Sequence, residues 1–181
     1  MWGVVRKSRL LVVGLVLVCA GCGAGRHRFE ETIDPCVVLE GDVVAPVTVG
    51  LHHEGSWPDE SKAVSKADYE STACDVIYAR QVGYTVERSN TRTLHLDIRR
   101  FNGEDAFSDA GRRFGAPWDD KVAGPWDHAT IQDGQANAVF DNLAIHLEIS
   151  DVSNVSLGLN TVAVTAGLLG AVVNRLKAHF G

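Results

Sequence analysis

The chain has 181 residues, 45% of them hydrophobic, and a formal net charge of −6 at neutral pH. This length is enough for one domain with a substantial core. The acidic balance disfavours nucleic acid as a partner, and it disfavours electrostatic attachment to anionic lipid headgroups.

The N-terminal segment begins with basic residues at positions 6, 7 and 9, followed by an apolar run at residues 10–19 and then Ala20-Gly21-Cys22. This order is typical of a secretory signal peptide, and about ten apolar residues are too few to cross a bilayer. Ala20-Gly21-Cys22 resembles the lipobox of bacterial lipoproteins. The resemblance implies a signal peptide at residues 1–21 and a diacylglyceryl group on Cys22 with acyl chains such as palmitate. It also implies attachment to the extracytoplasmic face of the cell membrane. The alternatives are a secreted protein cut near Ala20 and an uncleaved anchor.

The four cysteines then fall into two groups. Cys19 would leave with the signal peptide and Cys22 would carry lipid, so that Cys36 and Cys74 remain. Disulfides form outside the cytoplasm, which favours a bridge between these two residues. A metal site would need more ligands, and a redox pair would favour the Cys-x-x-Cys spacing. Removal of the signal peptide also takes away three basic residues and no acidic residue, which leaves 14 basic against 23 acidic residues.

The remaining chain is expected to form a short acylated tether at residues 22–33 and a single globular domain at residues 34–181. Asp34 and Pro35 are typical of a helix N-cap and first helical position. We expect a helix over Cys36–Val44, interrupted by Gly41 and ending before Pro46. A brief strand is expected over Val47–Leu51, with mostly loop over residues 52–72 and, as an alternative, a helical turn around Glu60–Lys66.

Alternating patterns in the second half predict antiparallel strands. Leu94, Leu96 and Ile98 alternate with polar residues over 93–101, and the same pattern occupies residues 143–150. Further strands are expected at residues 74–79 and 135–140, with a hairpin turn at Asp141-Asn142.

Two helices are expected beside these strands, at residues 104–114 and from Asn160 to the C-terminus. Residues 152–174 carry no charge, which raises the alternative of a membrane span, but helical spacing of the apolar positions favours a packed helix. The predicted fold class is therefore α+β: an antiparallel sheet with one face covered by helices, including a C-terminal amphipathic helix.

The histidines suggest two candidate clusters. His52-His53-Glu54 is compact, but adjacent residues of a strand point in opposite directions. His95 and His146 lie on the outward faces of predicted strands, where their rings would meet if the strands are neighbours. No His-Glu-x-x-His or Cys-x-x-Cys pattern is present, so we favour a solvated polar face over a metal site, and we expect no cofactor.

Tryptophans beside aspartates form a near-repeat. Residues 115–119 (GAPWD) recur as residues 123–127 (AGPWD), and Trp57-Pro58-Asp59 is a looser echo. In such loops the tryptophan ring is able to stack on a sugar ring while the carboxylate accepts hydrogen bonds from the sugar hydroxyls. The alternative is that the tryptophan rings cap the core. The candidate ligand-binding residues are Trp118, Asp119, Asp120, Trp126, Asp127 and His128. The last two and the two neighbouring aspartates, Asp119 and Asp120, are also candidates for an acid–base or cation cluster.

The chain from residue 22 to about 180 resembles the actinobacterial lipoproteins of domain-of-unknown-function family 3558. The resemblance rests on the lipobox, on Asp34-Pro35-Cys36 followed by aliphatic residues, on Cys74 at the head of a strand, and on the C-terminal helix. Gly41 and Pro46, and Asp75-Val76 after the second cysteine, depart from the family pattern. The resemblance implies a Cys36–Cys74 disulfide and a cell-envelope location, and it transfers no catalytic residue.

The leading functional hypothesis is a non-enzymatic, membrane-tethered envelope lipoprotein that binds a ligand or a protein partner. The second is a factor that binds or hydrolyses cell-wall glycan through the Trp118 and Trp126 loops. A third is a lipid carrier, which would need a large apolar cavity. Motifs for a serine nucleophile or a phosphate-binding loop are absent from the sequence.

Overall fold

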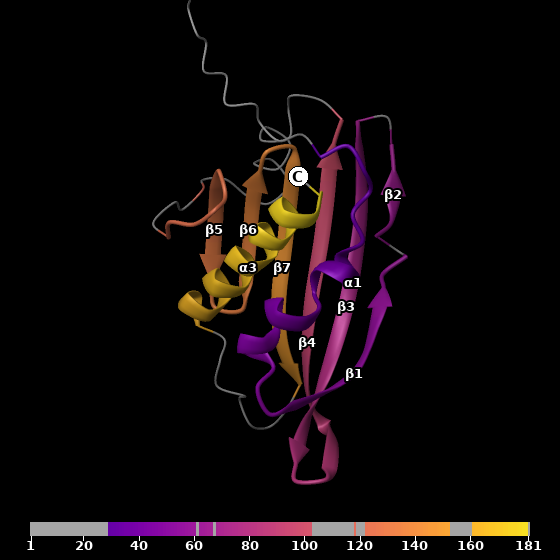
Figure 1. Ribbon diagram of the computed structural model, residues 1–181, viewed down its shortest axis with the longest axis vertical. Coiled ribbons are helices and arrows are strands. Elements are labelled where there is room, and N and C mark those ends of the chain that lie inside the picture. The colour runs from indigo at the N-terminus through magenta and orange to yellow at the C-terminus, as the bar shows by residue number, and fades with distance from the viewer. Residues whose placement is uncertain are drawn as a thin grey trace, which may run out of the picture.

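The sheet dominates the computed structural model, which describes residues 29–60, 62–66, 68–102, 118, 122–152 and 161–180 (Figure 1). Seven antiparallel strands pair in the order β1-β3-β4-β7-β6-β5, with β2 beside β3. The fold is α+β, as the sequence predicts. The strands are β1 (Leu51–Pro58), β2 (Val64–Ser65), β3 (Tyr69–Val82), β4 (Thr85–Phe101), β5 (His128–Gln132), β6 (Gln135–Phe140) and β7 (Leu143–Val152).

Helices cover one face of this sheet. They are α1 (Pro35–Val38), the 3₁₀ turns η1 (Gly41–Val43) and η2 (Ala45–Val47), and the long C-terminal α3 (Val162–Phe180) (Figure 1). The inward residues of the central strands, such as Leu96 and Leu147, are fully buried against Leu169, Val173 and Leu176 of α3. The predicted C-terminal helix and the inward alternation of β4 and β7 are therefore confirmed. In the described part of the chain, no helix is long and apolar enough to cross a membrane.

The first helix begins as the sequence predicts and ends earlier. The Asp34 side chain accepts a hydrogen bond from the Cys36 backbone N–H at 2.9 Å, and Pro35 occupies the first turn. The helix stops at Val38, because Gly41 adopts a left-handed φ of 59° and the chain continues in 3₁₀ turns. Pro46 lies inside η2, so it does not follow the helical segment as predicted.

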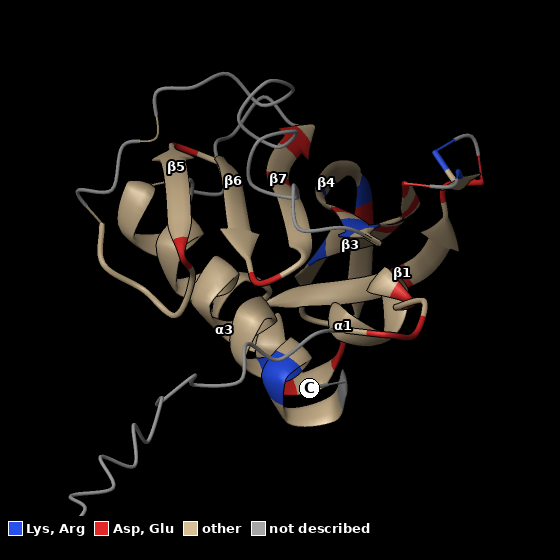
Figure 2. Cartoon of the chain, turned by 90° about the horizontal axis from the view of Figure 1, so that it is seen from above, with Lys and Arg blue, Asp and Glu red and all other residues tan. Residues whose placement is uncertain are grey.

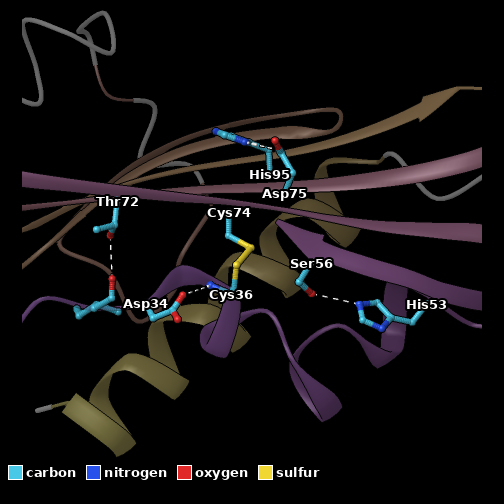
Figure 3. The surroundings of a disulfide bond; sticks show 9 residues. Asp34, Cys36, His53, Ser56, Thr72, Cys74, Asp75 and His95 are labelled. Carbon is cyan, nitrogen blue, oxygen red and sulfur yellow. Dashed lines mark hydrogen bonds and ion pairs between the residues drawn. A yellow bond between two sulfur atoms is a disulfide. The ribbon is translucent and has the colours of Figure 1, made fainter. Parts of the chain in front are cut away.

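The disulfide between Cys36 of α1 and Cys74 of β3 is present, which confirms that prediction. It joins the helical layer to the second strand of the sheet. Figure 3 shows the bridge on the helix-covered side of β3.

The prediction for residues 47–72 is wrong. Val47 ends η2, Gly50 has a left-handed φ of 74°, and the strand starts only at Leu51. Polar residues conceal this strand in the sequence, because β1 is an edge strand with a bulge between His53 and Gly55 and buries no residue fully. Most of the expected loop is therefore β1, β2 and the start of β3.

The domain also begins earlier than predicted. Phe29 and Ile33 are 1% and 2% exposed and belong to the main core. The buried Asn142 amide holds the Phe29 backbone: its Oδ1 accepts from the Phe29 N–H at 3.0 Å, and its Nδ2 donates to the Phe29 and Phe101 carbonyls at 3.0 Å each. Residues 29–33 are thus part of the domain, which corrects the expected boundary at residues 33 and 34. Cys22, the expected signal peptide and the expected helix at 104–114 lie outside the described residues.

Candidate functional site

The sheet has a second face, opposite α1 and α3, which we call the outer face. Neighbouring residues of a strand point to opposite faces, and Figure 3 shows this at one point of β3: Cys74 points to the helical layer and Asp75 to the outer face. The outer face carries polar side chains on its central strands, and Figure 2 shows charged positions gathered on β3 and β4.

Strand pairing aligns these side chains in a line that crosses the sheet at right angles to the strands. Directly paired residues of antiparallel strands point to the same side. The register joins residues of β1, β3, β4, β7, β6 and β5 in turn. We call this line the polar row; its members are Trp57, Asp75, His95, Glu148, Gln135 and Gln132.

His95 is the centre of a hydrogen-bonded group within the polar row. Its Nε2 lies 3.0 Å from the Lys62 ammonium, and its Nδ1 lies 2.7 Å from Asp75 Oδ1. An ammonium only donates, so Nε2 accepts from Lys62 while Nδ1–H donates to Asp75. The contacts therefore fix the imidazole in one tautomer and orient it between the Lys62 ammonium and the Asp75 carboxylate.

His146 lies beside His95, as expected if their strands were neighbours. The two ring centroids are 6.0 Å apart, His146 Nδ1 lies 2.7 Å from the Asn137 amide oxygen, and its Nε2 lies 4.0 Å from Glu148. Burial, followed by the neighbouring His95, lowers the pKa of His146 below its usual 6.5, although Asp97 and Glu148 act in the opposite direction. His146 therefore favours the neutral form, in which its ring serves as a hydrogen-bonding group without charge.

The pair of histidines does not make a metal centre. Within the residues that the structure describes, no group of three or more His, Cys, Asp or Glu side chains is arranged to hold a metal ion. Both ring nitrogens of His95 are already in contact with Lys62 and Asp75. The groups beside these rings that can accept hydrogen bonds from solvent or a ligand are the half-exposed carboxylates of Asp75 and Glu148.

Trp57 ends the polar row with an exposed aromatic ring. It is 49% exposed, and its six-membered ring lies against Gly55, where an added Cβ would come within 2.5 Å of Cη2. Only a glycine lets the ring lie so close to the strand. One face of the indole thus rests on β1, and the side chain keeps half its surface open to solvent.

The tryptophans of the near-repeat contact different parts of the structure. Trp126 packs against the main core, while Trp118 packs against a second cluster on the outer face that contains Tyr69 and Phe101. The Trp118 ring centroid is 6.4 Å from that of His128. Asp127 accepts a hydrogen bond from the Asp141 backbone at 2.8 Å, which stabilises the β6–β7 turn. Asp119 and Asp120 lie outside the described residues.

Comparison with known proteins finds no matching family model, no similar curated protein and no similar solved structure. Sequence reasoning identified His95 and His146 but not the polar row, because its six members come from six strands and only their register brings them together.

Proposed function

We propose that the chain is a membrane-tethered lipoprotein of the cell envelope, of the kind the family 3558 resemblance implies, and that it binds a ligand or partner without catalysing a reaction. Lipid on Cys22 is the proposed attachment. The disulfide between Cys36 and Cys74 supports an oxidising compartment. Seven residues span at most about 25 Å, so this lipid would hold Phe29 near the membrane surface.

The observation that carries the binding role is the polar row on the outer face. The helical layer uses the other face of the sheet to build the core, whereas Asp75 and Glu148 on the outer face are each 38% exposed. A hydrogen bond from His95 holds the Asp75 carboxylate in place, and such a prearranged group lowers the entropic cost of binding.

A photo-crosslinking amino acid at Ser150 tests this role in native membranes. Ser150 is partly exposed and is paired with Thr93 on the outer face, next to the polar row and outside its hydrogen bonds. The matched control is Asn174, an exposed position on α3. We expect an adduct from position 150 and none from position 174. Equal adducts from both positions, or none from position 150, would contradict the binding role.

The attachment is tested separately by cell fractionation. Cys22→Ala should move the protein from the membrane to the soluble fraction, while Cys19→Ala should leave it in the membrane. Unchanged partitioning of Cys22→Ala would refute lipid attachment at this residue.

A further inference from the structure

We infer that the ligand of the outer face is a neutral polysaccharide, bound along the polar row with one sugar ring stacked on Trp57. This inference rests on the proposed binding role and names the class of ligand. It depends on the indole, the hydrogen-bonding chemistry of the row, its length and its charge.

The Trp57 indole provides the stacking surface. The face of a pyranose ring formed by its C–H groups is apolar, and it stacks on a flat aromatic ring whose other side is supported. Gly55 provides that support, because its missing side chain lets the indole lie on the backbone of β1. An indole held in this way is rigid before the ligand arrives, and little conformational entropy is lost on binding.

The other members of the polar row match sugar hydroxyls, each of which both donates and accepts a hydrogen bond. The Asp75 and Glu148 carboxylates accept, and the Gln132 and Gln135 amides both donate and accept. His95 uses its two ring nitrogens to contact Lys62 and Asp75, so it orients the Asp75 carboxylate and does not itself bind a hydroxyl. Both glutamines are exposed. The row therefore offers two carboxylate acceptors and two amide groups along its length, and its members beyond Trp57 are polar.

The length of the row favours a polymer over a single sugar. Neighbouring strands are about 4.8 Å apart, so the five intervals from β1 to β5 extend over roughly 24 Å. This distance exceeds the size of one pyranose ring several times. A linear chain laid across the strands would contact Trp57 at one end and Gln132 at the other.

Charge complementarity favours a neutral chain. The carboxylates of Asp75, Asp97 and Glu148 lie on this part of the outer face. The nearby cations are Lys62, in contact with His95, and Arg99, whose guanidinium packs on the Tyr69 ring, so one negative charge remains in excess. Acidic polysaccharides would meet net repulsion there, which adds to the acidic balance of the whole chain.

The test is affinity electrophoresis of the purified full-length protein in gels that contain the neutral or the acidic polysaccharide fraction of the producing cells' envelope. The neutral fraction should retard the wild-type protein and the acidic fraction should not. Trp57→Ala should weaken binding at least tenfold, whereas Trp57→Phe should keep part of it. Tyr84→Ala is the matched control, because Tyr84 is a fully exposed aromatic residue in the β3–β4 turn, outside the row. Thermal unfolding of each variant checks that the fold is retained.

Two results would overturn the inference: no retardation by the neutral fraction, or equal retardation of the wild type and Trp57→Ala. If either occurs while the crosslinker at position 150 still captures a protein in native membranes, the outer face binds a protein and only the ligand class is wrong. If position 150 also captures nothing, the proposed binding role fails as well.

Discussion

Arg92 and Asp151 form a buried, bidentate ion pair between β4 and β7. Arg92 Nε lies 2.7 Å from Asp151 Oδ1, and its Nη2 lies 2.8 Å from Oδ2, while its Nη1 donates to the Val47 carbonyl at 2.7 Å. Arg92 is 1% exposed and is the largest fully buried side chain among the residues that the structure describes. The guanidinium connects the sheet to η2, and it lies on the face that packs against the helices.

Removal of the Asp151 charge should therefore be costly. Asp151→Asn leaves the buried guanidinium without its counter-charge, and we expect the free energy of unfolding to fall by about 3–5 kcal/mol. Asp42→Asn is the control: Asp42 lies 3.9 Å from Arg175 and its side chain is 92% exposed, so this change should cost less than about 1 kcal/mol. Chemical denaturation of both variants provides the comparison. Similar losses in the free energy of unfolding would show that the buried ion pair stabilises the fold no more than the exposed one.

The disulfide should contribute strongly to stability. Cys36 and Cys74 are 38 residues apart, and closing a loop of this size stabilises the folded state by about 4 kcal/mol in the chain-entropy model. The double variant Cys36→Ala/Cys74→Ala should lose that amount in chemical denaturation. Mass analysis of the unreduced wild-type protein should find the two thiols bonded to each other; two free thiols would contradict the pairing.

Asn142 should control the start of the domain. Its amide makes hydrogen bonds to the backbone of Phe29 and Phe101. Asn142→Ala removes all of them and leaves buried backbone groups unpaired, with an expected loss of at least about 2 kcal/mol. Hydrogen exchange at the Phe29 amide should become fast in this variant and stay slow in Asn174→Ala. An unprotected Phe29 amide in the wild-type protein would place the domain boundary later in the chain.

His146 should make the fold sensitive to mild acid. Its pKa is lowered in the folded state, chiefly by burial and then by His95, so the unfolded chain binds a proton more readily. The contribution of His146 is fully present above its unfolded pKa of about 6.5 and is lost as the pH falls from there through the folded pKa. His146→Gln should remove this component of the pH dependence in denaturation curves. An identical pH dependence in the variant would show that His146 does not contribute.

The sequence predicts the parts of the fold whose signals are local. Leu94, Leu96 and Ile98 alternate, the apolar residues of α3 recur at helical spacing, and Asp34 with Pro35 marks a helix start; the structure contains each of these features. The two cysteines left for pairing are bonded to each other.

The remaining features depend on contacts between distant residues. Phe29 enters the core because Asn142, 113 residues away, binds its backbone. The edge strand β1 has a polar sequence because an edge needs little burial, so alternation could not reveal it. In the sequence, Trp57 is only part of a loose repeat of the Pro-Trp-Asp segments. In the structure, pairing with Asp75 places it at the end of the polar row.

The proposed binding role requires that a ligand covers the outer face in native membranes. Hydroxyl-radical footprinting of intact membranes, compared with the purified and washed protein, tests this claim most directly, because Trp57 and Tyr84 act as probe and internal control in one experiment. The account predicts that Trp57 oxidises several times more slowly in intact membranes, while the oxidation rate of Tyr84 is unchanged. Equal oxidation rates of Trp57 in the two preparations would contradict it.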